Sequence, residues 1–196
     1  FDSVTTAFGT AGTGGFGIKG DSLAGYSPYL QNVVTVFMAL FGVNFSIYYL
    51  LLLREFKIAL LDEELRLYFG LMLDSIALIS WNTVPLFGSL REAIHHSAFQ
   101  VSSIMTTSGF STVDFNVWPP FSKAILLGLM FVGASAGSTG GGIKCARILL
   151  LMKELRRNIR KTMHPRAVRL VRINNRGIDE HVIQHVNAYM AASLVL

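Results

Sequence analysis

Cysteine and charge are both scarce in this chain of 196 residues, and each scarcity excludes a class of protein. The single cysteine, Cys145, excludes an internal disulfide and leaves no cysteine spacing typical of a structural metal site. Charged residues make up 15% of the chain and hydrophobic residues 52%, a balance outside the usual range of soluble globular domains. No Ser-His-Asp set and no paired carboxylates occur in a convincing context, so nothing in the sequence indicates an enzyme.

The hydrophobic residues gather in four long runs, at 29–53, 67–90, 124–152 and 182–196. The first has no charge over 25 positions, and as one helix it would extend about 37 Å, enough to cross a hydrocarbon core of about 30 Å. The second carries one acid, Asp74, which we expect about two turns from the cytoplasmic end of its helix. The chain is therefore predicted to be an all-α membrane protein.

Basic residues are concentrated in one stretch. Between positions 144 and 176 there are eleven Lys and Arg residues and one acid. Next to a membrane span this bias follows the positive-inside rule, which places residues 153–181 in the cytoplasm. Because this rule accounts for the basic residues, we expect no nucleic-acid partner. The loop 54–66 then lies on the same side, because one pair of helices separates the two segments. Residues 1–28 and 91–120 face outward.

Glycine interrupts the third hydrophobic run. Residues 133–144 read Gly-Ala-Ser-Ala-Gly-Ser-Thr-Gly-Gly-Gly-Ile-Lys, a composition that breaks a helix. Lipid offers no hydrogen-bond partner to the freed backbone groups, so such a segment survives where protein buries it or where it lines a watery cavity. Interrupted helices of this kind mark ion or substrate pathways. The break therefore predicts a conduit.

The two outward segments repeat one another. Each runs from a short stretch rich in Ser and Thr into the pattern Thr-x-Gly-Phe, at 13–16 and 107–110, and a long apolar run follows each. A half-helix entering from outside, a Thr/Gly loop and then a spanning helix form a pore loop, in which backbone carbonyls replace the water shell of an ion. Two such loops in one chain predict a repeated pore.

At these motifs the chain resembles a known family. Residues 106–119 and 133–144 look like the third repeat of the Trk/Ktr/HKT potassium transporter superfamily, and residues 11–17 look like the filter of its second repeat. The tail 163–168, Met-His-Pro-Arg-Ala-Val, is more similar to the TrkH branch than to the KtrB branch. The resemblance covers essentially the whole chain. It implies a K⁺-channel-like pore of helix–pore-loop–helix units in the plasma membrane of a prokaryote, with a broken helix in the third repeat.

The resemblance also divides the chain. Residues 1–53 would hold the end of the second repeat (pore half-helix, filter and spanning helix), residues 54–66 a cytoplasmic loop, and residues 67–152 the whole third repeat. Residues 153–181 would form a basic cytoplasmic segment, and residues 182–196 the start of a fourth-repeat helix. We therefore expect a fragment of a four-repeat subunit, and no ion conduction by these residues alone.

The resemblance places the site residues in two groups. Ion-binding filter positions are expected at Thr13, Gly14, Gly15, Thr107, Ser108 and Gly109. An intramembrane gate below the filter is expected at Ala136, Gly137, Ser138, Thr139, Gly140, Gly141 and Gly142, together with Lys144. Lys144 would anchor this loop, repel cations at the inner mouth, or merely extend to the membrane interface, and Asp74 is either functional or a helix-pairing acid.

The resemblance implies K⁺ uptake through this filter, by channel or symport, with gating by the glycine-rich loop. K⁺ would be the transported ion and would bind only at the filter residues. No organic cofactor is expected, because residues 12–17 fit the dinucleotide pattern G-x-G-x-x-G without the crossover unit that it requires. Implied partners are membrane lipid, a second subunit in a homodimer, and a cytoplasmic nucleotide-binding regulatory subunit of the TrkA/KtrA type.

Three alternatives stay open on the sequence alone. The same pore would carry Na⁺ as well as K⁺, since the first-repeat filter residue that bears on this choice is absent from the chain. A secondary transporter would use half-helix N-termini to bind an organic anion. A non-conducting scaffold would use the glycine loops only for packing.

Overall fold

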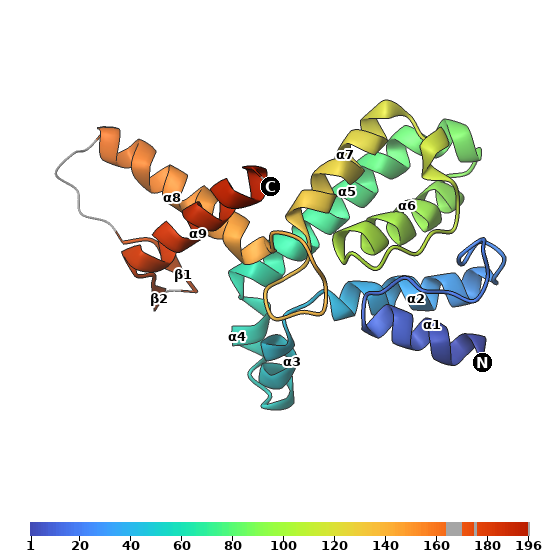
Figure 1. The fold of residues 1–196 in the computed structure, drawn as a ribbon, viewed down its shortest axis with the longest axis horizontal. Helices are drawn as coiled ribbons and strands as arrows, with labels where there is room; N and C mark the ends of the chain where they lie inside the picture. The colour runs from blue at the N-terminus through green and yellow to red at the C-terminus, as the bar shows by residue number, and fades with distance from the viewer. Residues whose placement is uncertain (164–169, 175, 196) are drawn as a thin grey trace.

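The computed structural model describes residues 1–163, 170–174 and 176–195 (Figure 1). Positions 164–168 of the TrkH-like tail lie outside the described residues. In chain order the elements are α1 (Asp2–Ala11), α2 (Pro28–Phe41), α3 (Phe45–Leu52), α4 (Phe56–Leu60), α5 (Glu63–Phe87), α6 (Leu90–Met105), η1 (Phe115–Val117), α7 (Pro120–Val132), α8 (Cys145–Met163), β1 (Arg172–Ile173), β2 (Arg176–Gly177) and α9 (Glu180–Val195). The prediction of an all-α protein is confirmed, because the only sheet in the described residues is the short antiparallel pair β1–β2.

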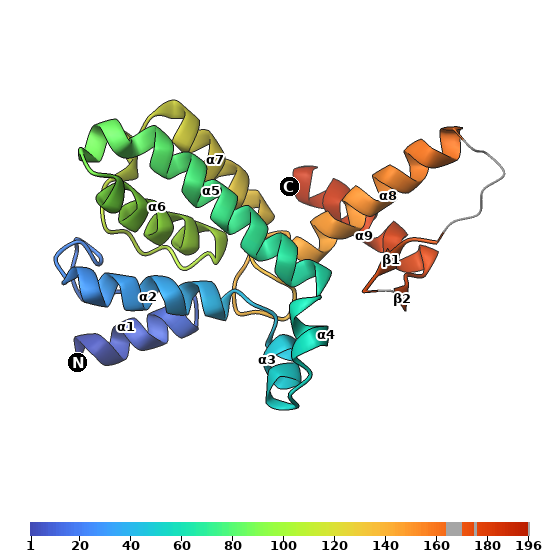
Figure 2. The ribbon, with the colours of Figure 1, turned by 180° about the vertical axis from the view of Figure 1, so that it is seen from behind.

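Helix α5 is the central element of the fold. It begins after Asp62, whose side chain accepts a hydrogen bond of 2.8 Å from Leu65 N, and it ends where Gly88 takes a left-handed φ of 70°. α6 packs back along α5, α7 packs on both, α2 lies along α6, and α1 lies along α2 (Figure 1, Figure 2). The main core between these helices includes Tyr68, Met72, Ile79, Met105, Leu126 and Leu129.

Among the described residues, α5 is the one helix that by itself is long and apolar enough to cross a membrane. α2 and α3 would add a second span if both halves belong to one crossing, but the two are bent by 91° at the break between them. The expectation that residues 29–53 form one straight helix is therefore wrong. α7 is apolar but has only 13 residues.

The bend between α2 and α3 has a local and a tertiary cause. The side chain of Asn44 accepts a hydrogen bond of 2.9 Å from Ser46 N and so caps α3 as a new helix. The carbonyl of Gly42 accepts a hydrogen bond of 3.0 Å from Ser135 N, on the glycine-rich loop. A Cβ at Gly42 would lie 2.2 Å from the hydroxyl oxygen of Tyr68, so the chain has room only for glycine here. The hydropathy of the sequence reveals neither the Asn44 cap nor the tertiary contacts of Gly42.

We expect Gly42→Ala to destabilise the complete protein by about 1–3 kcal/mol, the usual cost of overpacking. Gly70→Ala is the matched control, because a Cβ at Gly70 meets nothing within 4 Å and alanine favours the helix. Thermal unfolding in detergent should show a lower midpoint for Gly42→Ala alone, and Tyr68→Phe should recover part of the loss. An unchanged midpoint for Gly42→Ala would contradict the described packing.

Helix α5 starts earlier than the hydrophobic run that predicted it. The segment 54–66 therefore contains α4 and the first turn of α5. Asp74 lies near the middle of α5, on its exposed side. The predicted break in the third run is confirmed, since residues 133–144 separate α7 from α8. α8 itself continues across the expected boundary between residues 152 and 153.

Candidate functional site

The two Thr-x-Gly-Phe loops, residues 13–16 and 107–110, leave their helices in the same way. α1 ends at Gly12 and α6 at Thr106, and the backbone hydrogen bonds of the two exits recur at a constant offset of 94 positions (12 to 106, 14 to 108). The matching bonds are Gly12 N to Phe8 O at 2.8 Å and Thr106 N to Ser102 O at 3.1 Å, then Gly14 N to Gly9 O and Ser108 N to Ser103 O, both at 2.9 Å. The sequence repeat is therefore a repeat of backbone geometry.

Every second residue of each loop has a positive φ. Thr13 and Gly15 have φ of 50° and 66°, and Thr107 and Gly109 have φ of 59° and 83°. A left-handed threonine is uncommon and costs about 1–2 kcal/mol, so its presence in both copies indicates a conformation that the surrounding structure enforces. Alternating the sign of φ turns successive carbonyls toward one side of the chain. Such a row of main-chain oxygens is the type of ligand set that binds a dehydrated monovalent cation.

The two loops touch each other through their main chains. A Cβ on Gly15 would lie 2.1 Å from the carbonyl oxygen of Ser108. The second loop also packs against α1, since the buried Phe110 ring would meet a Cβ on Gly9 at 3.0 Å. Within the second loop, Ser103 Oγ of α6 donates a 2.5 Å hydrogen bond to Phe110 O. The counterpart Phe16 is 81% exposed. The expected filter positions of both repeats are thus brought together.

The glycine-rich loop, residues 133–144, closes on itself at its base. Ile143 N and Lys144 N donate hydrogen bonds of 3.2 and 3.1 Å to the last carbonyls of α7, those of Phe131 and Val132. Gly133 and Gly142 cross there with φ of 71° and 82°, and a Cβ on either would lie within 2.8 Å of the other's Cα. Only glycine fits both positions, so the loop leaves and re-enters the helical path at one point.

The tip of the glycine-rich loop lies against both Thr-x-Gly-Phe loops. Thr13 Oγ1 donates a hydrogen bond of 3.0 Å to Thr139 O, and Gly141 N donates one of 2.7 Å to Thr107 Oγ1. Gly140 lies against the end of α6, because a Cβ there would be 2.8 Å from Thr106 O. The expected gate residues therefore contact the expected filter residues of both repeats.

Two charged side chains also hold the glycine-rich loop, Lys144 of the loop itself and Glu64 of α5. Lys144 Nζ donates a hydrogen bond to Gly140 O. Of the three roles expected for Lys144, this contact supports that of an anchor for the loop. Glu64 Oε1, on the first turn of α5, accepts from Ala136 N at 2.5 Å and from Ala146 N at 3.1 Å. Sequence reasoning missed Glu64, which it assigned to a cytoplasmic loop. No sequence signal connects it with residues 72 positions away.

Two further residues of the expected gate, Gly137 and Ser138, also form hydrogen bonds. Ser138 Oγ donates to Ser135 O at 2.6 Å, and Gly137, with φ of 69°, accepts from Phe45 N at 3.1 Å through its carbonyl. In the described part of the chain no group of three or more His, Cys, Asp or Glu residues gathers that could hold a metal ion. The oxygens that the two Thr-x-Gly-Phe loops and the tip of the glycine-rich loop present to one another are main-chain carbonyls and threonine hydroxyls.

Comparisons with known proteins identify the family of the chain. Residues 1–195 match the TrkH family, described as "Cation transport protein". The Trk system potassium uptake protein TrkH of Escherichia coli (strain K12) is 34% identical over 198 residues, which are 98% of this chain and 41% of that protein. The Trk system potassium uptake protein TrkG of the same strain is 31% identical over 189 residues, 95% of this chain and 39% of that protein.

A solved structure is similar as well. The crystal structure of the potassium transporter TrkH from Vibrio parahaemolyticus superimposes with a TM-score of 0.89 at 28% identity, over 99% of this chain and 43% of that one. The chain thus spans about two-fifths of the length of these relatives. By its sequence match over nearly every residue, the chain belongs to the TrkH family of cation transport proteins.

Proposed function

We propose that this chain supplies two filter loops and the gate of a K⁺ uptake pore in the plasma membrane of a prokaryote. One observation carries the proposal: two loops of equal backbone geometry meet through Gly15 and Ser108, and a single glycine-rich loop is hydrogen-bonded to the threonine of each. Loops that served only to pack helices together would not require the same strained backbone conformation in both copies. Loops that bind one ion through their carbonyl oxygens do require a repeated backbone conformation.

Potassium is the favoured ion because the relatives that match the chain are named potassium uptake proteins. Each cation entering a cell gains about 2.3 kcal/mol per 100 mV of inside-negative potential, so uptake through this pore requires no ATP chemistry in the chain. The residues act within a four-repeat subunit that forms a homodimer. A cytoplasmic nucleotide-binding subunit of the TrkA/KtrA type controls the gate.

Gating follows from the contacts of the glycine-rich loop. The loop lies next to Thr13 and Thr107 and is hydrogen-bonded to both. Lys144 and Glu64 add hydrogen bonds to the main chain at Gly140 and Ala136. The crossing glycines at the base of the loop allow its tip to swing while α7 and α8 stay in place. Opening is therefore a local movement of residues 136–142.

The test is rubidium uptake by the complete transporter, purified and placed in liposomes with an inside-negative potential. We expect saturable uptake that external K⁺ suppresses and Na⁺ does not. Equal suppression by Na⁺ would identify a less selective cation pore. Uptake of an organic anion that is indifferent to K⁺ would identify the secondary transporter, and absence of any flux would identify the scaffold.

A further inference from the structure

Helix α9 packs across α8, and the contacts between the two helices lead toward the base of the glycine-rich loop (Figure 1, Figure 2). Arg157 of α8 makes a two-pronged ion pair with Glu180 of α9, at 2.8 and 2.9 Å, and this guanidinium lowers the pKa of the Glu180 carboxyl. Nearer the loop, the carboxylate of Glu154 accepts hydrogen bonds of 3.0 and 3.2 Å from Asn187 Nδ2. The two helices therefore run in opposite directions, and the later residues of α9 approach the loop.

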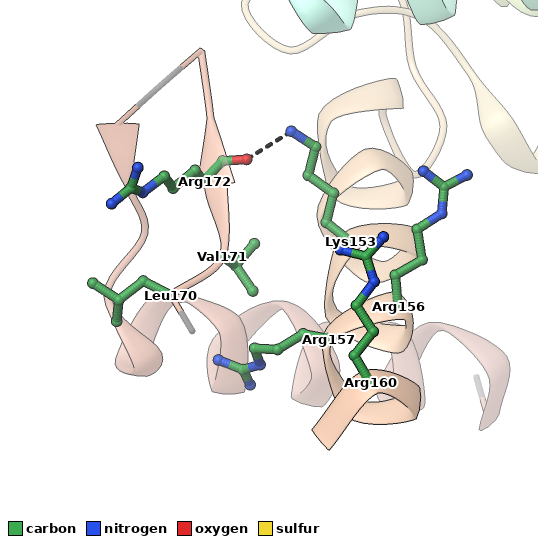
Figure 3. A pocket seen from close by; sticks show the side chains of 7 residues that line it. All are labelled: Lys153, Arg156, Arg157, Arg160, Leu170, Val171 and Arg172. Carbon is green, nitrogen blue, oxygen red and sulfur yellow. Dashed lines mark hydrogen bonds between the residues drawn. The ribbon is translucent and has the colours of Figure 1, made fainter. Parts of the chain in front are cut away.

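α8, β1 and α9 share a small core of their own. Leu150 of α8 and Ile183 of α9 are buried together with Val171, the residue before β1. Lys153 of α8 donates a hydrogen bond of 2.6 Å to the carbonyl oxygen of Arg172 in β1, as Figure 3 shows. Helix α9 is thus held on α8 by apolar as well as polar contacts.

Arg147 joins α9 to the glycine-rich loop. Its Nη1 donates a hydrogen bond of 2.8 Å to the carbonyl oxygen of Ile143, at the base of the loop. The same guanidinium lies over the ring of Tyr189 on α9, with Cζ 4.1 Å from the ring centroid. A planar guanidinium donates hydrogen bonds from its edge while its face stacks on an aromatic ring. The positive-inside rule accounts for a basic residue at this position, but not for these two simultaneous contacts.

The first turn of α8, which carries Arg147, is also bonded to the start of the loop. Cys145 N donates a hydrogen bond of 3.0 Å to Ala134 O, and the buried Cys145 Sγ lies 3.5 Å from Gly133 O. A displacement of this turn should break these contacts and expose the thiol. The reactivity of Cys145 therefore reports on the packing of the loop base.

We propose that Arg147 is a positioning residue through which α9 holds the base of the glycine-rich loop. Its bond to Ile143 fixes the residue next to Lys144, and Lys144 in turn is bonded to the tip of the loop at Gly140. A shift of α9 on α8 then reaches residues 136–142 through the main chain of the loop and not through the filter loops. Its effect on ion uptake rests on the proposed function, whereas the hold of α9 on the loop does not.

The test measures the rate at which N-ethylmaleimide modifies Cys145 in the complete transporter in detergent, with the modified peptide identified by mass spectrometry. Modification of a buried thiol follows the population of the loosened state. We expect Arg147→Gln and Tyr189→Leu each to raise the rate about fivefold or more, because each removes the stacked pair. Tyr189→Phe keeps the face of the ring and should react as the wild type does. So should Arg160→Gln, which removes a charge from an exposed position of the same helix.

A double variant shows whether the two side chains act through one contact. Arg147→Gln/Tyr189→Leu should react no faster than Arg147→Gln alone. If Tyr189→Leu leaves the rate unchanged, or if Tyr189→Phe or Arg160→Gln raises it equally, α9 does not hold the loop through Arg147 and the proposal is wrong. Tyr189 is 44% exposed, so its variants keep the test valid if Arg147→Gln does not fold.

Rubidium uptake by liposomes separates the hold of α9 on the loop from the proposed function. Tyr189→Leu should raise the maximal rate about threefold or more and leave the KM for Rb⁺ unchanged, because a looser gate opens more often and the filter loops are not altered. Faster thiol modification with unchanged uptake would mean that α9 holds the loop but that the loop is not a gate. Faster uptake with unchanged modification would leave the gate in place and overturn the role of Arg147.

Discussion

Replacing Gly15 by alanine should abolish rubidium uptake by the complete transporter. The added Cβ would lie 2.1 Å from the carbonyl oxygen of Ser108 and 3.1 Å from its carbonyl carbon. Because both atoms belong to the backbone, no side-chain rotation relieves the clash, and the two proposed filter loops must separate. The left-handed φ of 66° adds about 1–2 kcal/mol of strain. The initial rate of ⁸⁶Rb⁺ uptake in potassium-depleted cells measures the effect, and we expect a loss of about a hundredfold or more.

Substitutions at two other glycines, Gly20 and Gly109, are controls that distinguish the effect of the Gly15–Ser108 clash from that of replacing any glycine by alanine. Gly20→Ala is the neutral control, since Gly20 has open space around its Cβ and no left-handed φ. Gly109 is the counterpart of Gly15, and its φ of 83° alone should lower uptake by about tenfold in Gly109→Ala. Wild-type uptake by Gly15→Ala, at normal protein levels in the membrane, would mean that the contact with Ser108 is not part of an ion path.

Replacing Lys144 by methionine should raise rubidium uptake. The ammonium group donates to Gly140 O and so ties the tip of the proposed gate to its base. A hydrogen bond to a charged group contributes about 1.5–3 kcal/mol, so its loss shifts the balance between closed and open loops by about ten- to a hundredfold. Removing the positive charge also lowers the electrostatic cost for an entering cation. Both effects act in the same direction.

Lys144→Arg is the control for this gain. It keeps the positive charge, and it places a side chain of similar length at the same left-handed φ of 80°. Uptake by the arginine variant should stay near the wild-type rate. Lower uptake by the methionine variant would contradict the gating proposal, because Lys144 would then support the conducting state.

Local sequence predicted the two Thr-x-Gly-Phe loops and the break between α7 and α8, because the geometry of these segments is encoded locally. The left-handed conformations at Gly15 and Gly109 favour glycine, and the run of glycines after Ser138 disfavours a continuous helix. The pattern Thr-x-Gly-Phe is therefore sufficient to locate both loops in the sequence. The contact between the loops at Gly15 and Ser108 was not predicted from the sequence, and only the tertiary structure supplies it.

Features set by distant contacts escaped the sequence. Hydropathy joined residues 29–53 into one helix, because Gly42 and Asn44 are too few polar or flexible positions to mark a bend of 91°. The bend depends on the hydroxyl of Tyr68 and on Ser135, both far along the chain. Glu64 reads as an ordinary acid in the first turn of a helix. Its role in holding Ala136 arises from packing alone.

The central claim is that main-chain oxygens of residues 13–15 and 107–109 face one ion path. The most direct measurement is the anomalous scattering of Rb⁺ in crystals of the complete transporter. We predict an ion peak within coordination distance of carbonyl oxygens from both segments, with residues 136–142 next to it on the cytoplasmic side. Bound Rb⁺ away from both segments, with their carbonyls turned into solid protein, would contradict the account.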